Sequence, residues 1–338
     1  MDLPYSLRSS LPMGLRYLMF QHHPPDPCRP QRRKTRPVRS IFLVIALLVT
    51  SGGAQVIAAT PKVVATIRPL HFIATAITAG VSQPELLLHQ PGSVHHFQLR
   101  PSQVKLLNQA SIIVWIGPGL ELPLSRYLNT NRPGVVTVQT LTGLKRLRPR
   151  SAHGPASHRH SDTDPHLWLD PENARIIATA ITDVLSRQDP LHRPQYQKNR
   201  EEFMEKLQSL KQWLRDQAAQ LPTTPFLVYH DAYQYLENVL GIRAVSAVYP
   251  GPTELLSAKS GLRLRHAVQK HHISCLLVEV NTPVKALNTV FGDSAPALAY
   301  LDPLGTTLTA NPDAYFEMIK NNTTALATCL RDHLPQKK

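Results

Sequence analysis

The feature that most constrains the fold is a long periodic segment near the middle of the chain, from residue 194 to about residue 219. Its apolar residues recur at steps of four and three, as on one face of an α-helix; they are Phe203, Leu207, Leu210 and Leu214. At roughly 1.5 Å per residue such a helix is about 39 Å long, enough to run along a whole domain. We therefore expect it to connect two lobes of the protein.

The regions on both sides of this segment alternate between apolar, β-branched runs and helical patterns. Residues 111–117 and 273–280 are continuous apolar runs, which are typical of strands buried in a parallel sheet. Helical patterns span residues 101–110 and 171–185, and we also predict a helix over residues 119–128. This alternation predicts an α/β fold of two lobes joined by one long rigid helix.

The beginning of the chain predicts export. A cluster of arginine and lysine, from Arg32 to Arg39, precedes the apolar run of residues 41–49, and small residues follow. The run is shorter than the roughly 20 residues that a membrane-spanning helix needs, so a cleaved signal peptide is favoured over a permanent anchor. Cleavage after Ala54 or Ala59 fits this pattern. No cysteine follows the run, so nothing indicates a lipid-anchored start.

These patterns predict four parts of the chain. They are a signal peptide with an extended basic region (1–59), an N-terminal lobe (60–190), a linking helix (191–221) and a C-terminal lobe (222–338).

The formal net charge of +14 raises the question of a nucleic-acid partner. However, eight of the 37 basic residues lie between Arg8 and Arg39, against Asp2 and Asp26, so about +6 of the charge belongs to the signal region. Elsewhere no basic stripe is interleaved with aromatic residues. The composition therefore argues against nucleic-acid binding.

The cysteines agree with export. Cys28 leaves with the signal peptide, so the mature chain keeps Cys275 and Cys329. In an oxidising compartment a disulfide between them is favoured over two buried free thiols. The chain contains no CxxC motif, which argues against a zinc–thiolate site.

Four side chains with the chemistry of metal ligands lie at the ends of predicted strands or just beyond them. They are His95, His166, His230 and Asp302. Ligands of open α/β sheets collect at the carboxyl ends of the strands, so we expect these side chains to converge. Three imidazoles with a carboxylate or water suit tetrahedral Zn²⁺. The alternative for each histidine is structural: His95 as part of a polar loop tip, for example, and His230 as a hydrogen-bonded core residue.

Three further histidines, His153, His158 and His160, lie in a polar segment predicted as a loop over residues 152–163. Glycine, proline and serine break any helical or strand period there. The segment is either an auxiliary metal-binding loop or a plain flexible connection. Bulky apolar residues follow His166 directly, so we expect His166 to be held by packing, unlike the loop histidines.

Several motifs, in order along the chain, resemble those of the metal-binding proteins that serve ABC importers for zinc or manganese. They are LRPSQVKLLNQASIIVWIGPGLE, DPHLWLDPENAR, VYHDAYQYLE and YLDPLG. The resemblance extends from Lys62 to Leu330 and is strongest to the periplasmic zinc-binding branch. It implies two α/β lobes bridged by one rigid helix, with the metal in the cleft between the lobes.

Carried over position by position, the resemblance places the metal ligands at His95, His166 and His230. It places a carboxylate that binds the metal directly or through water at Asp302, and a disulfide of the zinc branch at Cys275 and Cys329. Val94 departs from the family, because some zinc-binding members have an acidic residue there. Glu279 matches a family position, but its surrounding motif is not continued, so we do not assign it to the metal.

The resemblance therefore implies a carrier and not an enzyme. We expect a monomer that binds one Zn²⁺ in the periplasm and delivers it to the membrane permease of an ABC importer. Manganese is the alternative cargo, although three imidazoles favour zinc over an oxygen-seeking ion. The rival class is a secreted zinc hydrolase, against which the chain has neither HExxH nor GxSxG.

Overall fold

The protein is described here from a computed structural model, which covers residues 60–89, 94–128, 132–150, 163–249, 258–282, 284–292 and 295–333. These residues fall within one unit, Ile57–Lys338. The predicted signal peptide and the loop histidines His153, His158 and His160 lie outside the described residues. A search of the described helices finds none with the length and apolar character needed to cross a membrane.

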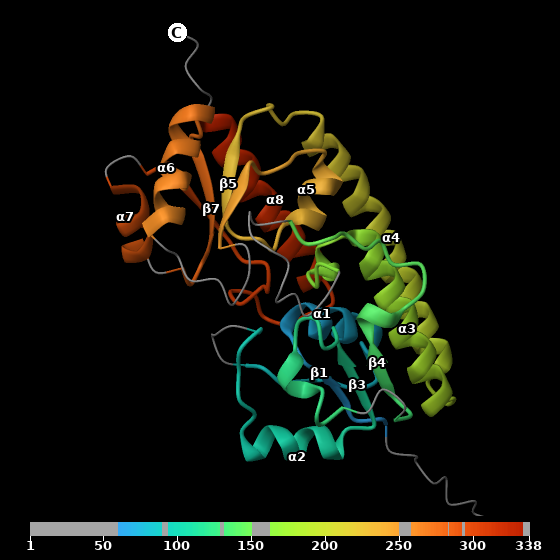
Figure 1. Ribbon diagram of the computed structural model, residues 1–338. Helices are drawn as coiled ribbons and strands as arrows, with labels where there is room; N and C mark the ends of the chain where they lie inside the picture. The colour runs from blue at the N-terminus through green and yellow to red at the C-terminus, as the bar shows by residue number, and fades with distance from the viewer. Residues whose placement is uncertain are drawn as a thin grey trace, which may run out of the picture. The chain divides into compact units, whose positions relative to one another are not determined.

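The N-terminal lobe is built on a four-stranded parallel sheet with the strand order β2-β1-β3-β4 (Figure 1). The strands are β1 (Val63–Ala65), β2 (Glu85–Leu86), β3 (Ile112–Trp115) and β4 (Val135–Thr137). Its helices are α1 (Arg68–Ile77), α2 (Pro101–Gln109) and α3 (Pro171–Gln188). The register pairs Val63 with Ile112 and Ile113 with Val135. Because all four strands are parallel, their carboxyl ends lie at one edge of the sheet.

The C-terminal lobe repeats this plan with the strand order β6-β5-β7-β8, again parallel. The strands are β5 (Phe226–His230), β6 (Ser246–Tyr249), β7 (Cys275–Glu279) and β8 (Ala297–Leu301). The helices are α5 (Gln234–Leu240), α6 (Ala258–His271), α7 (Val284–Phe291) and α8 (Ala314–Asp332). The predicted fold of two parallel α/β lobes is confirmed.

Alternate residues of the central strands face opposite sides of each sheet, as the two-residue period of a strand requires. In β7, Cys275 and Leu277 pack into a core shared by both lobes, whereas Leu276 and Val278 pack under α6 and α7. Both faces of the sheet are therefore apolar and covered, which explains why the central strands have continuous apolar sequences.

Helix α4 (Arg193–Ala218) is the predicted long helix, and it contacts elements of both lobes. Near its start, Asn199 donates hydrogen bonds to the carbonyl oxygens of Ile77 and Ala79 in the N-terminal lobe. Further along, the ring of Phe203 lies 4.9 Å from that of Phe316 in α8, centroid to centroid. The apolar stripe of α4 is buried between these contacts, so one helix supports both lobes. The exact lobe boundaries stay predictions.

Two parts of the chain differ from the sequence-based expectation. The helix predicted over residues 119–128 is reduced to a single 3-10 turn, Leu122–Leu124, with Pro123 inside it. Proline lacks the amide hydrogen that a continuing helix needs, which accounts for the short turn. The sequence analysis also did not predict β6, α6 or α7.

The lobes approach closely at Gly305, which follows β8 and has a positive φ of 65°. A Cβ atom at this position would lie 2.5 Å from Cε2 of Phe72, a buried residue of α1. Only glycine allows this approach of the C-terminal lobe to α1.

We expect Gly305→Ala to lower the free energy of unfolding by about 2–4 kcal/mol, from backbone strain and overpacking together. Gly241→Ala is the matched control, because Gly241 also has a positive φ (69°) but no atom within 4 Å of its added Cβ. The control should cost only the strain, about 1–2 kcal/mol. Urea denaturation of the metal-free proteins measures both, and equal costs would contradict the close approach.

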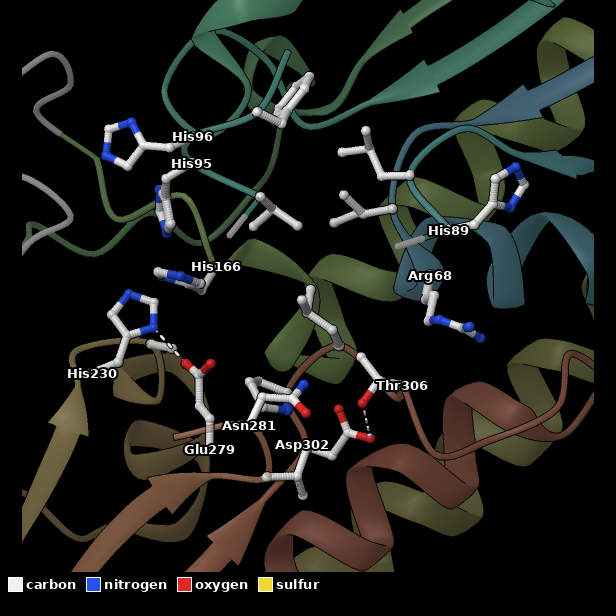
Figure 2. Close-up of a pocket in the computed structure, with 18 of the residues that line it drawn as sticks. Arg68, His89, His95, His96, His166, His230, Glu279, Asn281, Asp302 and Thr306 are labelled. Atoms are coloured by element: carbon white, nitrogen blue, oxygen red, sulfur yellow. Dashed lines mark hydrogen bonds and ion pairs between the residues drawn. The ribbon is translucent and has the colours of Figure 1, made fainter. Parts of the chain in front are cut away.

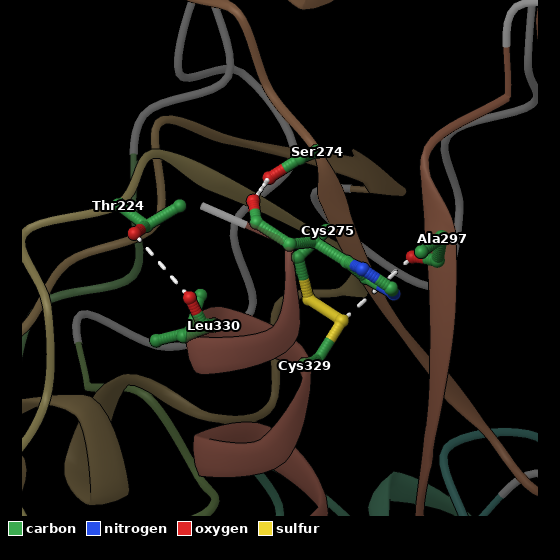
Figure 3. The surroundings of a disulfide bond; sticks show 7 residues. Thr224, Ser274, Cys275, Ala297, Cys329 and Leu330 are labelled. Carbon is green, nitrogen blue, oxygen red and sulfur yellow. Dashed lines mark hydrogen bonds between the residues drawn. A yellow bond between two sulfur atoms is a disulfide. The ribbon is translucent and has the colours of Figure 1, made fainter. Parts of the chain in front are cut away.

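A disulfide joins Cys275 in β7 to Cys329 in α8 (Figure 3), with a Cα–Cα distance of 5.9 Å. The predicted pairing is confirmed. The bond closes a loop of 54 residues and ties the last helix to a central strand of the C-terminal sheet. Both cysteines are buried, and neither lines the cleft described below.

Reduction of this disulfide should lower the free energy of unfolding by about 2–4 kcal/mol, because the unfolded chain regains the entropy of an open loop. Metal affinity, by contrast, should change little, since the bond lies away from the cleft. Urea denaturation with and without reductant, followed by zinc titration, tests both statements. A large loss of affinity on reduction would count against this separation.

Candidate metal-binding site

Three histidines from distant positions in the sequence meet at one point (Figure 2). One ring nitrogen from each of His95, His166 and His230 lies within 4.8 Å of the others. Their ring centroids are 5.5 Å apart for His95 and His166, 5.4 Å for His95 and His230, and 5.0 Å for His166 and His230. The predicted convergence of these three side chains is therefore observed.

His166 is held in place on every side. It is 5% exposed and lies directly before the buried 3-10 turn Leu167–Leu169. Its Nδ1 lies 2.7 Å from Oδ1 of Asp164, which also accepts a hydrogen bond from the backbone amide of His166. Since a carboxylate only accepts, Nδ1 carries the hydrogen and Nε2 carries the lone pair. Nε2 is buried and has no hydrogen-bond partner among the described residues, so a metal ion would satisfy it.

Asp164 is in turn fixed by α5. Its Oδ2 accepts a hydrogen bond from Nε2 of Gln234 at 2.8 Å, and its carbonyl oxygen accepts one from the Tyr235 hydroxyl at 2.9 Å. Both carboxylate oxygens and the carbonyl oxygen of this buried aspartate therefore accept hydrogen bonds. The orientation of the His166 ring depends on contacts with both lobes.

His230 ends strand β5, at the carboxyl edge of the C-terminal sheet. Its Nδ1 lies 2.6 Å from Oε1 of Glu279, which ends the neighbouring strand β7. Burial alone would lower the pKa of His230, but the hydrogen bond and the negative charge of Glu279 outweigh it and raise the pKa. Burial would likewise raise the pKa of Glu279, and His230 lowers it instead. The carboxylate makes this imidazole more basic.

His95 lies in the segment between β2 and α2 and is half-buried. Burial, followed by the neighbouring imidazoles of His166 and His230, lowers the pKa of His95 to about 2. The ring is therefore neutral at physiological pH, as a metal ligand must be.

The cluster is suited to a tetrahedral ion. Zinc lies about 2.0–2.1 Å from its imidazole nitrogens, which places those nitrogens about 3.3 Å from one another. A small inward movement of the rings from their present spacing, within 4.8 Å, reaches that geometry. Three nitrogen donors leave one coordination position open. His166 and His230 each direct the other ring nitrogen to a carboxylate, as metal-binding histidines commonly do.

Asp302 follows strand β8 and lines the same cleft, but it is not part of the histidine cluster. Its Oδ2 accepts hydrogen bonds from Oγ1 of Thr306 at 3.0 Å and from the backbone amide of Thr307 at 2.8 Å. Figure 2 shows this carboxylate beside Thr306, apart from the three imidazoles. A direct role as fourth ligand stays a prediction.

Sequence reasoning missed the roles of Asp164 and Glu279. The signal for Asp164 was its position two residues before His166, in the DPH motif. Glu279 matched a family position but was not assigned to the metal, and nothing in the sequence indicated that its strand lies beside β5. His96, next to His95 in the chain, is exposed and also lines the cleft.

The family model described as zinc-uptake complex component A, periplasmic, matches residues 63–329, which is well over half of the chain. The chain belongs to this family. It is similar to the high-affinity zinc uptake system protein ZnuA of Brucella abortus (strain 2308), with 30% identity over 335 residues that cover 88% of this chain and 99% of the relative.

Solved structures agree with this family assignment at the level of the fold. A crystal structure of ZnuA is 21% identical, with a TM-score of 0.68, and covers 80% of this chain and 99% of its own. The periplasmic zinc-binding protein TroA from Treponema pallidum is 19% identical, with a TM-score of 0.68 and the same coverage. The expected architecture of two lobes and a long connecting helix is confirmed.

The His230–Glu279 pair predicts how metal binding in this family member depends on pH. A zinc ion held by this cluster would need the unprotonated Nε2 of His230, and the pKa of His230 is raised above its ordinary value of 6.5. As the pH is lowered, zinc affinity should therefore begin to fall before pH 6.5 is reached. Below the raised pKa of His230 the loss should approach about tenfold per pH unit.

Glu279→Gln should move the onset of this fall to lower pH, because the charge that raises the pKa of His230 is gone. It should also weaken binding at pH 8 by about 10–100-fold, as loss of a partner to a metal-binding histidine usually does. The control is Glu317→Gln, which neutralises an exposed carboxylate on α8. Titrations from pH 8.0 to 5.5 measure the effect, and identical profiles for wild type and Glu279→Gln would refute it.

Proposed function

We propose that this protein captures Zn²⁺ after export to the periplasm and delivers it to the membrane permease of an ABC importer. The observation that supports this most directly is the meeting of His95, His166 and His230 within 4.8 Å. Membership of the family of periplasmic zinc-uptake components supports the same function. We propose that the carrier acts as a monomer and holds one ion per chain.

Zinc is the proposed cargo because all three converging side chains are imidazoles. Imidazole nitrogen suits zinc, whereas manganese prefers sites rich in carboxylate oxygen. Two carboxylates do lie next to the rings, but each already accepts a hydrogen bond from a ring nitrogen: Asp164 from His166 and Glu279 from His230. Neither is placed as an uncommitted oxygen ligand.

The same two hydrogen bonds favour a carrier over a hydrolase. A zinc hydrolase needs a general base beside the metal-bound water. Asp164 and Glu279 each accept a hydrogen bond from a ring nitrogen, so both carboxylates serve to orient imidazoles. We therefore propose that the chain binds and releases zinc without chemical change.

For the fourth coordination position we propose water, with Asp302 acting on the ion through that water. The Oδ2 atom of Asp302 accepts hydrogen bonds from Thr306 and Thr307, which hold the carboxylate away from the rings. A water-filled fourth position is the usual state of a three-ligand zinc site.

Single replacement of His95, His166 or His230 by alanine should weaken zinc binding by at least about 100-fold, because each removes one of three nitrogen donors. The exported protein, stripped with a chelator, should take up one zinc per chain by elemental analysis. His266→Ala, which removes an exposed histidine of α6, should bind like the wild type. A wild-type affinity in any of the three variants would remove that residue from the ligand set.

The same titration applied to Asp302→Asn decides the fourth position. An effect of less than about tenfold fits action through water, whereas a loss as large as that of the histidine variants would make Asp302 a direct ligand. Competition with Mn²⁺ tests the choice of metal: displacement of zinc by equal manganese would contradict a zinc carrier.

A further inference from the structure

Helices α6 and α7 cover the face of the C-terminal sheet that is turned away from α4 (Figure 1). On the inner side of α6, Leu264 and Val268 pack with Leu276 of β7, in a core separate from the one that both lobes share. None of the described residues of α6 lines the metal-binding cleft. A partner bound to the outer side of α6 would therefore leave the cleft accessible.

The outer side of α6 is basic. Arg263, Arg265, His266 and Lys270 are all exposed, and the helix contains no aspartate or glutamate. Leu262 lies among them and is 61% exposed. With about 3.6 residues per turn, Leu262 and His266 fall on the side of the helix opposite the one that packs on the sheet. We refer to these five residues as the basic face of α6.

The positive charges of the basic face are not neutralised within the described part of the protein. The side chains of Arg263, Arg265 and Lys270 form no hydrogen bond or ion pair with another described residue. Exposed cations on other helices are commonly paired, as Arg175 is with Glu172 on α3. Helix α6 thus presents free guanidinium and ammonium groups to its surroundings.

Acidic residues around α6 do not cancel this charge. Helix α7 beside it has Lys285 and no acidic residue. Residues 254–293 contain five basic and three acidic residues, and none of the acids is in either helix. Glu279 ends β7 in the cleft, where it accepts a hydrogen bond from a histidine, while Glu254 and Asp293 lie outside the described residues. The last turn of α8 adds one residue of each sign.

The arrangement of these charges indicates an extended negative surface as the partner. Arg263 and Lys270 are about 10 Å apart along the helix axis, from a rise of about 1.5 Å per residue. They line no pocket described above, whereas a small anion would need cations that converge in a concave site. A protein partner would need an apolar centre to its interface, and Leu262 is the only large apolar side chain of the basic face.

A membrane that contains anionic phospholipid fits these features. Its negative charge extends over an area larger than the protein, so lysine and arginine residues that lie apart each contribute to the attraction. A leucine beside basic residues is typical of helices at the membrane–water interface, where the apolar side chain enters the headgroup region and the cations stay in water.

We propose that the basic face of α6 binds the surface of a membrane that contains anionic phospholipid. This contact concentrates the exported carrier at the membrane that holds its permease, while the cleft stays accessible. The purpose of the contact rests on the proposed delivery of zinc to a permease, but the contact itself needs no metal.

Vesicle binding by the metal-free exported protein tests this proposal. At about 0.1 M salt, sedimentation with vesicles of mixed phosphatidylglycerol and phosphatidylcholine should be at least about tenfold stronger than with phosphatidylcholine alone. The preference should disappear at about 1 M salt, where the screening length is only about 3 Å. Arg263→Gln, Arg265→Gln and Lys270→Gln in one variant should weaken binding to the mixed vesicles at least about tenfold.

The matched control for this triple variant removes two arginines and one lysine from exposed positions outside the C-terminal lobe. It should bind the mixed vesicles like the wild type, because the net charge changes equally but the basic face is intact. Its substitutions are Lys105→Gln, Arg148→Gln and Arg187→Gln.

A fluorescence measurement locates the contact on the protein. Leu262→Trp places an indole on the basic face, and its emission, compared with the wild type, should shift to shorter wavelength when the mixed vesicles are added. Leu191→Trp is the control, because Leu191 is also exposed (67%) but lies in the turn between α3 and α4. Its emission should not shift.

The possible results separate this proposal from that of the zinc carrier. Equal binding to both kinds of vesicle, equal losses in the two triple variants, or an emission shift at residue 262 no larger than at residue 191 overturns the membrane contact and leaves the zinc carrier intact. Binding only to vesicles that contain the permease assigns the basic face to a protein partner and also overturns it. Loss of zinc binding with vesicle binding preserved supports the membrane contact and overturns the carrier.

Discussion

Trp168 joins the two lobes at the level of the histidine cluster, and the geometry of the site depends on this joint. The indole of Trp168 is fully buried, and its nitrogen donates a hydrogen bond to the carbonyl oxygen of Pro303. The backbone carbonyl of Trp168 accepts a hydrogen bond from the Tyr315 hydroxyl, and both partners belong to the C-terminal lobe. His166 lies two residues before Trp168. An imidazole from the first half of the chain is thereby held against His230 from the second half, although neither segment alone could form the cluster.

A second buried contact braces the same region. The guanidinium of Arg150 binds Asp231 through Nε at 2.7 Å and Glu237 through both terminal nitrogens, at 2.8 and 2.7 Å. Asp231 directly follows His230 in the chain. Burial disfavours the charged form of Arg150, but the two carboxylates outweigh it and raise its pKa, so the guanidinium stays charged. Buried ion pairs of this kind are sensitive to loss of either partner, which leaves an uncompensated charge.

The general fold could be predicted from the sequence because parallel sheets covered on both faces require continuous apolar strands, and those runs are visible at residues 111–117 and 273–280. Helix α4 was equally visible, since its buried stripe extends from Tyr196 to Leu214, about five turns. The convergence of His95, His166 and His230 followed from their positions at strand ends. Their neighbours were harder to predict: the pairing of Glu279 with His230 depends on β7 lying beside β5, and strand order is not encoded locally. The failed helix at residues 119–128 had helical spacing, but Pro123 interrupts it.

Helix α4 has a consequence for how the cargo leaves. Because Asn199 binds the N-terminal lobe and Lys206 binds Asp313 of the C-terminal lobe, one continuous helix acts as a strut along both halves. A continuous helix has no hinge of its own, so it disfavours a large swinging movement of one lobe against the other. We infer that release begins with local displacement of one imidazole. His95 is the candidate, because it lies in the segment between β2 and α2, whereas His230 ends strand β5 and His166 is buried directly before a 3-10 turn.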